Sequence, residues 1–327
     1  MFSNQKLTLL GKTKSPAKIN LSLDVLWKRP DGYHELRGLM AKVRLYDTVS
    51  IFHSKDQLED GLEFSNQLGP PFEQALERDK TFNGPGNLAL KALRAFRAKT
   101  GYPKPGAVIG LDKAIPKGAG LGGGSSNAAA VLRILNRAIG LSEPELKLMG
   151  KDLGGDVPFF LDPNTFCWIG GIGDRLKAYH FDTLGSQVLL INPGVELSTA
   201  EVFRHLDLTF SQNGSINLTA PSEPYWGPGF EFSFDSKLAG LENGADDQEI
   251  RPSWGINSLE DTALRLCPEL GPTREKLLEL KPPPTCIGLS GSGPTYWAIY
   301  QKRPEAQAAL TALAPSGLWV RLVTFER

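Results

Sequence analysis

Residues 116–127 read Pro-Lys-Gly-Ala-Gly-Leu-Gly-Gly-Gly-Ser-Ser-Asn, and an alanine-rich stretch with helical spacing follows them directly. Five of the seven residues from Gly118 to Gly124 are glycine. Glycine loses much conformational freedom on folding, and a cluster of glycines is typical of backbone that must approach a ligand closely. Backbone N–H groups at the start of a helix, together with the positive end of the helix dipole, bind phosphate. We therefore predict a phosphate-binding loop rather than a flexible connector, because linkers seldom lead directly into a capped helix.

This loop differs from two well-known phosphate-binding patterns. Residues 118–123 satisfy Gly-x-Gly-x-x-Gly, but the dinucleotide fingerprint needs a strand just before it and an acidic residue about 20 residues later. Here Pro116 and Lys117 come before the glycines, and residues 142–144 have the character of a new helix start. A Walker A loop requires Gly-Lys followed by Ser or Thr, which this loop lacks. The loop is therefore of a third kind.

Hydrophobic spacing on both sides of the loop predicts a mixture of strands and helices. The expected strands are residues 19–27, 39–52, 108–111, 166–169, 188–191, 295–300 and 318–324. The expected helices are one that begins after Asn87 as its N-cap, 125–138, one that begins after Ser142, 258–266, 273–280 and 304–313. Polar segments rich in Gly, Pro, Ser and Asn predict loop excursions at 53–86 and 211–250. Because strands and helices do not alternate strictly, we expect an α+β fold.

Length and composition exclude several classes of protein. A chain of 327 residues suggests two packed domains, and 41 % hydrophobic with 22 % charged residues is ordinary globular usage. Thirty-six Lys and Arg residues offset thirty-six Asp and Glu residues, so we expect no nucleic-acid or membrane partner. Three widely spaced cysteines argue against a disulfide framework or a zinc site. No apolar run approaches about 18 residues, and we expect a cytoplasmic protein.

Four segments together resemble the motifs of the GHMP kinases, enzymes that phosphorylate small molecules such as galactose, homoserine and mevalonate. The glycine-rich loop, continued by Ala128 and Ala129, looks like the second family motif. Pro-Ala-Lys-Ile-Asn at residues 16–20 resembles the first motif, and Gly-Gly-Asp-Val-Pro at 154–158 resembles the family's aspartate segment. Gly-Leu-Ser-Gly-Ser-Gly-Pro at 288–294 is similar to the third motif. The resemblance spans about residues 15–300.

A fifth segment, Asp-Gly-Tyr-His at residues 31–34, resembles the cytidine-recognition turn of one branch of this family. Tyr33 can stack on a pyrimidine and His34 can hydrogen-bond its polar edge. The alternative for this segment is that Tyr33 only anchors the turn and that His34 is solvated. For the whole chain, the resemblance implies phosphoryl transfer from ATP to the 2-hydroxyl of 4-diphosphocytidyl-2-C-methyl-D-erythritol, in the non-mevalonate route to isoprenoid precursors. The alternatives are another GHMP kinase, such as one acting on homoserine or mevalonate, and a non-catalytic nucleotide-binding module; the presence of Lys18 and Asp156 argues against the module.

The resemblance also assigns roles to single residues. It implies that Asp156 accepts the hydroxyl proton and that Lys18 pairs with Asp156 and with the charge developing on the phosphoryl group; in isolation, Asp156 could equally cap a turn. Mg²⁺ is expected to bridge the ATP phosphates, with Ser126 as its expected protein contact and no further metal ligand assigned. The expected substrate-binding residues are Asn20, Tyr33 and His34, and Asn87 is expected near the nucleotide. The expected ATP-binding residues are Pro116, Lys117, Gly118, Ala119, Gly120, Leu121, Gly122, Gly123, Gly124, Ser125 and Ser126. For Lys117 alone, a surface lysine is the default interpretation and a phosphate contact is the alternative.

The architecture implied by the resemblance has two domains with the active site in the cleft between them. Residues 1–180 would form a domain like the second domain of ribosomal protein S5, and residues 181–327 a ferredoxin-like domain. The assembly would be a monomer or a homodimer. The chain departs from the family pattern at Ser258, where Asp is frequent, and in the two long excursions.

Overall fold

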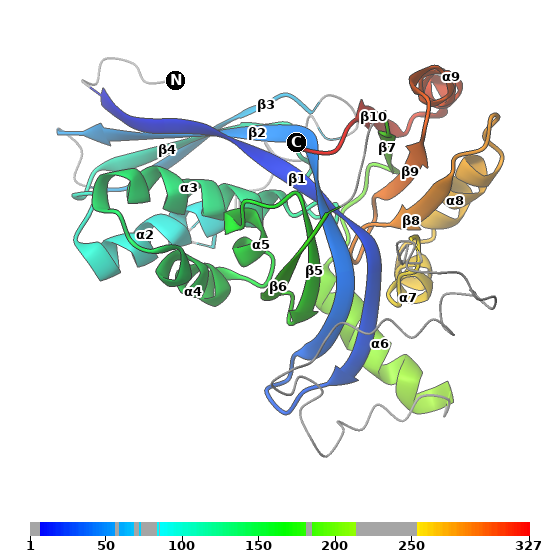
Figure 1. The fold of residues 1–327 in the computed structure, drawn as a ribbon, viewed down its shortest axis with the longest axis horizontal. Helices are drawn as coiled ribbons and strands as arrows, with labels where there is room; N and C mark the ends of the chain where they lie inside the picture. The colour runs from blue at the N-terminus through cyan, green and yellow to red at the C-terminus, as the bar shows by residue number, and fades with distance from the viewer. Residues whose placement is uncertain are drawn as a thin grey trace.

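Two sheets organise the chain in the computed structural model, which describes residues 7–55, 59–68, 72, 84, 86–180, 185–213 and 254–327 (Figure 1). The first sheet has the order β3-β4-β2-β5-β6, with β1 paired to β2. Its strands are β1 (Leu7–Lys28), β2 (His34–Ser54), β3 (Gly61–Asn66), β4 (Ala107–Lys113), β5 (Phe166–Gly171) and β6 (Arg175–Tyr179). Strand β2 pairs along its length with β1, and its other edge pairs with β5 and then with β4.

The alternation that predicts the first strand also places two polar side chains. Ala17, Ile19 and Leu21 are fully buried in the core. Successive side chains of a strand point to opposite faces, so Lys18 and Asn20 lie on the other face. These two residues line a cavity. Strand β1 therefore contributes to the core and to the site with alternate residues.

Four helices form a layer on one face of the first sheet: α2 (Leu88–Thr100), α3 (Gly123–Ile139), α4 (Glu143–Leu153) and α5 (Val157–Leu161) (Figure 1). Helix α3 packs on β1 and β2, and the other three pack against α3. Asn87 caps α2, because its Oδ1 accepts a hydrogen bond of 2.9 Å from the N–H of Ala89. Ser142 and Glu145 form a capping box at the start of α4. Both predicted helix starts are confirmed.

The second sheet has the order β10-β7-β9-β8, and all its pairs are antiparallel. Its strands are β7 (Gln187–Asn192), β8 (Cys286–Leu289), β9 (Tyr296–Tyr300) and β10 (Trp319–Val323). The remaining elements are α6 (Thr199–Asn213), α7 (Glu260–Leu266), α8 (Leu270–Leu278), α9 (Arg303–Leu313) and the 3₁₀ turn η1 (Ala314–Ser316). The end of the chain turns back to the first sheet, where Arg44 N–H donates to Thr324 O and Glu326 N–H donates to Lys42 O. The expected α+β class is confirmed.

The structure differs from the expectations in several segments. The segment expected to be a loop at 53–86 contains β3, whose residues 61–66 pair in parallel with β4. The apolar residues Leu62 and Phe64 alternate within this short strand, but glycine and polar neighbours conceal the pattern. Strands β6 and β8 and helices α5 and α6 were also not expected. Most of the rest of 53–86, and residues 214–250 of the second excursion, lie outside the described residues. None of the helices in the described ranges has the length and apolar character needed to cross a bilayer.

Candidate active site

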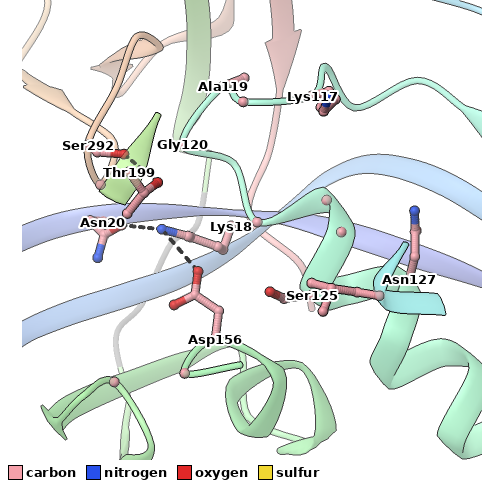
Figure 2. Close-up of a pocket in the computed structure, with 18 of the residues that line it drawn as sticks. Lys18, Asn20, Lys117, Ala119, Gly120, Ser125, Asn127, Asp156, Thr199 and Ser292 are labelled. Carbon is pink, nitrogen blue, oxygen red and sulfur yellow. Dashed lines mark hydrogen bonds and ion pairs between the residues drawn. The ribbon is translucent and has the colours of Figure 1, made fainter. Parts of the chain in front are cut away.

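A cavity of about 640 Å³ lies where the two sheets meet, and all four motif segments line it (Figure 2). The first half of the chain contributes β1, the glycine-rich loop, the turn at Gly155 between α4 and α5, and the turn at Gly173 between β5 and β6. Helix α6 and the turn at Gly291 and Ser292 contribute from the second half of the chain. Segments far apart in the sequence thus line one cavity.

Lys18 lies at the centre of this cavity. Its Nζ donates to Asn20 Oδ1 at 2.5 Å and lies 3.6 Å from Asp156 Oδ2 (Figure 2). Only 5 % of Lys18 is exposed, and an ammonium at such depth requires a carboxylate or polar partners. Its backbone N–H donates to Leu121 O at 3.0 Å, which fixes β1 against the glycine-rich loop. The cation therefore lies between the loop and the aspartate.

Asp156 precedes the five-residue helix α5 but does not cap it with its side chain. Its carboxylate instead extends toward Lys18 and remains one-third exposed to the cavity (Figure 2). Of the two interpretations open from the sequence, the geometry matches the carboxylate that projects into a site.

The glycine-rich loop ends in Gly122, the N-cap of α3, whose φ of +69° lies in the left-handed region. A Cβ at Gly122 would lie 2.9 Å from Lys18 Cγ and 2.9 Å from Phe160 Cζ. Only glycine permits this close passage of Lys18 beneath the loop. An α-helix leaves its first N–H groups without acceptors inside the helix, so the start of α3 presents donors beside the lysine.

The third motif forms hydrogen bonds to the loop and to β1. Ser290 Oγ donates to Gly120 O at 2.9 Å, and the N–H of Asn20 donates to Ser290 Oγ at 3.3 Å. The Asn257 amide in turn donates to Leu289 O and Gly291 O. The turn at 290–293 therefore links β1 to the glycine-rich loop.

Two expected loop residues do not face the cavity. Ser126 is buried, its N–H donates to Gly122 O, and its Oγ lies 2.7 Å from Ser15 Oγ. Ser125 lines the cavity instead, and its hydroxyl projects toward Asp156 (Figure 2). The Leu121 side chain is in the core. Ser125 is therefore placed better than Ser126 for a magnesium contact.

The other expected residues are distributed as follows. Asn20, Asn87 and the remaining loop residues line the cavity. Lys117 is half-exposed and its Nζ lies 3.7 Å from Glu196 Oε2. Tyr33 is 61 % exposed on the turn between β1 and β2. His34 is buried, and its ring stacks on Phe203 with centroids 5.1 Å apart.

Phe203 and Thr199 are site residues that the sequence analysis missed. Both lie on α6 and line the cavity, and Thr199 Oγ1 is 2.8 Å from Ser292 Oγ. The apolar residues Val202, Phe203 and Leu206 are spaced as in an amphipathic helix, and this spacing was the signal that could have revealed them.

A buried ion pair beneath the loop was also missed. Asp47 is fully buried and pairs with Lys113, which lines the cavity. The other carboxylate oxygen accepts the N–H groups of Ala114 and Ile115, each at 2.8 Å. Asp47 therefore fixes the chain just before the glycine-rich loop. A lone aspartate inside an apolar strand was the available signal.

The donor set near the loop fits a magnesium ion that is held mainly by phosphates and water. Across the described parts of the chain, no cluster of three or more His, Cys, Asp or Glu side chains is placed to hold a metal ion. Ser125 Oγ and the Asp156 carboxylate supply two oxygen donors on the same side of the cavity (Figure 2). Mg²⁺ commonly takes one or two protein oxygens together with substrate phosphates.

Comparison with known proteins assigns the chain to a family. Residues 87–162 match the family model of the GHMP kinases N terminal domain. The chain is 35 % identical to the 4-diphosphocytidyl-2-C-methyl-D-erythritol kinase of Pelobacter propionicus, over 95 % of this chain and 96 % of the relative. It is 37 % identical to the enzyme of that name from Syntrophus aciditrophicus, over 94 % of this chain and 96 % of the relative.

Solved structures agree. A crystal structure of 4-(cytidine 5'-diphospho)-2C-methyl-D-erythritol kinase matches with a TM-score of 0.65 and 31 % identity, over 97 % of this chain and 100 % of the other. A homoserine kinase from Cytophaga hutchinsonii has a TM-score of 0.56 at 14 % identity, over 99 % and 96 %, and shares the fold. The fold and the convergent motifs define a small-molecule kinase of the GHMP class. Within that class, the chain belongs to the 4-diphosphocytidyl-2-C-methyl-D-erythritol kinase family.

Proposed function

We propose that this protein transfers the γ-phosphoryl group of ATP to the 2-hydroxyl of 4-diphosphocytidyl-2-C-methyl-D-erythritol, releasing ADP and the 2-phosphate. The observation that carries the proposal is the Lys18–Asp156 pair, 3.6 Å apart, beside the N-terminus of α3 in one cavity. An ammonium, a carboxylate and a helix N-terminus together match the needs of phosphoryl transfer, which are positioning and charge stabilisation.

On the donor side, the ATP phosphates bind along the glycine-rich loop. Backbone N–H groups at the start of α3 neutralise their charge without a surplus of basic side chains. The Asp47–Lys113 pair fixes the chain before this loop, and the Ser290 hydroxyl fixes Gly120 within it. Both contacts favour a loop that is already in its binding conformation before ATP arrives.

On the acceptor side, the 2-hydroxyl oxygen attacks the γ-phosphorus while the bond from that phosphorus to the β,γ-bridging oxygen breaks. Asp156 takes the hydroxyl proton on a carboxylate oxygen. Lys18 holds Asp156 in place and offsets the negative charge on the transferred group. Asn20 accepts a hydrogen bond from Lys18 and so orients the ammonium.

For magnesium, we propose Ser125 and Asp156 as the protein oxygens, in place of the Ser126 contact expected from the sequence. At these two oxygens a bound ion would supply positive charge that stabilises the transferred phosphoryl group.

For the cytidine group, we propose recognition at the turn that joins β1 and β2. Tyr33 offers an exposed aromatic face, and Phe203 presents a second ring against His34 at the cavity wall. A planar base can stack on such an aromatic face, and His34 can hydrogen-bond its polar edge.

We also propose that the two sheets correspond to two domains, residues 1–180 and 181–327. The last strand of the first sheet ends at Tyr179, and the first strand of the second begins at Gln187. The expected likenesses, to the second domain of ribosomal protein S5 and to a ferredoxin-like domain, remain proposals of the same kind.

The test is an ADP-release assay with ATP, Mg²⁺ and the cytidylyl acceptor, run beside homoserine and mevalonate. We expect turnover with the cytidylyl acceptor, and we expect Asp156→Asn to lower kcat by about a hundredfold or more while ATP still binds. Asp152→Asn, which changes an exposed carboxylate on α4, is the matched control. Turnover by Asp156→Asn close to that of the control would contradict the role of Asp156, and ATP binding without transfer to any alcohol would favour a nucleotide-binding module.

A further inference from the structure

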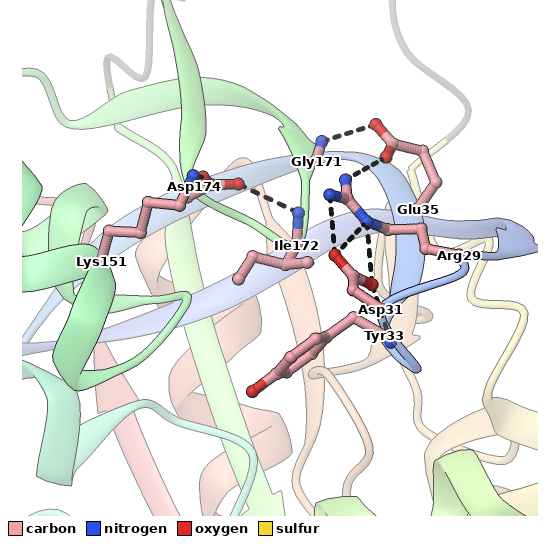
Figure 3. A network of polar contacts seen from close by, with 8 residues as sticks. All are labelled: Arg29, Asp31, Tyr33, Glu35, Lys151, Gly171, Ile172 and Asp174. Carbon is pink, nitrogen blue, oxygen red and sulfur yellow. Dashed lines mark hydrogen bonds and ion pairs between the residues drawn. The ribbon is translucent and has the colours of Figure 1, made fainter. Parts of the chain in front are cut away.

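The turn that joins β1 to β2 is tightly closed by its own contacts (Figure 3). The N–H of Arg29 donates to Tyr33 O at 2.7 Å, and the N–H of Tyr33 donates to Asp31 Oδ1 at 3.1 Å. Arg29 Nε also donates to Asp31 Oδ2 at 3.1 Å. Hydrogen bonds from Arg29 lower the pKa of the Asp31 carboxyl, which keeps the partner of Arg29 ionised. These contacts therefore fix the backbone of the turn that bears the Tyr33 ring.

Arg29 extends this closure to a buried carboxylate. Its Nη1 donates to Glu35 Oε2 at 2.7 Å, so one guanidinium contacts both Asp31 and Glu35. Glu35 is only 3 % exposed. A carboxylate at that depth destabilises a fold unless its oxygens are satisfied, and the planar fork of arginine suits contact with two carboxylates.

The second oxygen of Glu35 holds a different segment. Its Oε1 accepts the N–H of Gly171 at 3.0 Å. Gly171 is also the strand partner of the next residue, Leu36, at the end of the β2–β5 ladder. Gly171 begins the tip of the β5–β6 hairpin, residues 171–174. Glu35 thus connects the aromatic turn to this tip, as Figure 3 shows.

The hairpin tip in turn packs against the segment that carries Asp156. A Cβ at Gly155 would lie 2.5 Å from Ile172 O, and one at Gly173 would lie 3.8 Å from Asp156 Oδ1. Asp174 accepts the N–H of Ile172 at 3.0 Å and pairs with Lys151 on α4 at 2.7 Å, which holds the tip from its other side. Movement of the tip would therefore reach Asp156 through direct backbone contact.

We propose that Arg29 and Glu35 are positioning residues that hold the aromatic turn at a fixed place relative to Asp156, and so favour an acceptor that carries a nucleobase. The inference rests on the proposed function, since it assigns the turn to the base and Asp156 to the hydroxyl. Two fixed points allow a long acceptor to bind with its hydroxyl already placed, whereas an acceptor without a base contacts only one of them.

Two variants test the connection. Arg29→Lys retains the positive charge, but a single ammonium cannot reproduce the fork to both carboxylates. Glu35→Gln retains an oxygen for the Gly171 N–H but turns an amide N–H toward Arg29. We expect each to raise the KM for the cytidylyl acceptor about tenfold. The KM for ATP and the inhibition constant of CDP, which carries the base but no acceptor hydroxyl, should stay unchanged.

The matched control is Arg97→Lys. Arg97 also forms a forked pair, here with the single carboxylate of Asp60 at 2.6 and 2.8 Å, away from the cavity. We expect this change to lower the unfolding midpoint and leave both KM values unchanged, which separates a loss of stability from a loss of positioning.

Folded Arg29→Lys protein with an unchanged acceptor KM, or with the KM for ATP raised equally, would overturn the inference. Should Glu35→Gln fail to fold, Arg29→Lys decides alone, because its side chain is more exposed and its charge is kept. If the wild-type protein does not phosphorylate the acceptor at all, the proposed function fails and not this inference alone.

Discussion

Replacement of Gly120 by alanine is the sharpest probe of how the two halves of the chain form one site. Gly120 has a φ of +73°, and a Cβ there would lie 2.1 Å from Ser290 O and 2.9 Å from Gly293 O. Both obstacles are backbone atoms, so no side-chain rotation relieves the overlap. The loop or the turn at 290–293 must therefore move by about 1 Å, a displacement that can lower a rate about a hundredfold.

Gly140→Ala supplies the matched control. Gly140 caps α3 with a φ of +78°, and no neighbouring atom lies within 4 Å of the position its Cβ would take. Both variants carry the strain of a left-handed alanine, about 1–2 kcal/mol. Only Gly120→Ala adds the collision, so the difference between the two isolates the contact between the second and third motifs.

The assay combines urea unfolding with steady-state kinetics. We expect Gly140→Ala to lose about 1–2 kcal/mol of unfolding free energy with kcat/KM unchanged. We expect Gly120→Ala to lose more, and its kcat/KM to fall about a hundredfold, with the KM for ATP raised. If the two variants have the same kcat/KM, the turn at 290–293 does not position the loop and the reasoning is wrong.

Three further predictions test other parts of the structure. Phe203→Ala should raise the KM for the cytidylyl acceptor about tenfold and leave that for ATP unchanged, because an aromatic face is lost; equal effects in a two-substrate kinetic analysis would contradict this. Ser125→Ala should raise the Mg²⁺ concentration needed for half-maximal turnover. Ser126→Ala should lower the unfolding free energy by about 1 kcal/mol and leave turnover normal. A Mg²⁺ titration in which only Ser126→Ala needs more Mg²⁺ would show that Ser126 makes the metal contact. Burial and the nearby Arg133 lower the pKa of Lys42 from 10.5 to about 8. Between these pH values the unfolded chain binds more protons than the folded one. The unfolding free energy of the wild type should therefore rise by up to about 3 kcal/mol relative to that of Lys42→Met as the pH rises through this window. A difference in unfolding free energy between the two proteins that stays constant with pH, measured by urea unfolding, would refute this prediction.

The sequence predicted the elements whose signals are local. The alternation at 19–27 predicted a strand, and the structure shows that the polar residues Lys18 and Asn20 lie on the face opposite the core. Asn87 and Ser142 predicted helix starts because an N-cap depends only on its next few residues. Convergence of the motif segments came from resemblance, since no local pattern brings Lys18 to Asp156.

Contacts between distant segments could not be predicted in this way. Ser125 and Ser126 are chemically identical, and adjacent residues on a helix point about 100° apart, so only the position of Ser15 on β1 decides which one faces the core. Likewise Asp47 and Lys113 meet across two strands. Phe203 lies at the site because α6 packs near the β1–β2 turn, where its ring stacks on His34. The run of helically spaced apolar residues in α6 is short and bordered by polar residues, so it did not predict a helix.

The hairpin of β1 and β2 extends beyond the rest of the first sheet (Figure 1), with Lys18 along its length and Tyr33 just past its tip. In the proposed site, the number of residues between Lys18 and Tyr33 along this hairpin sets the distance that an acceptor must span. The strand pairing that stabilises the sheet would then also determine the length of acceptor that fits. Lengthening both strands by two residues would preserve their faces and register while increasing the distance between Lys18 and Tyr33. No substitution in the cavity can produce that change.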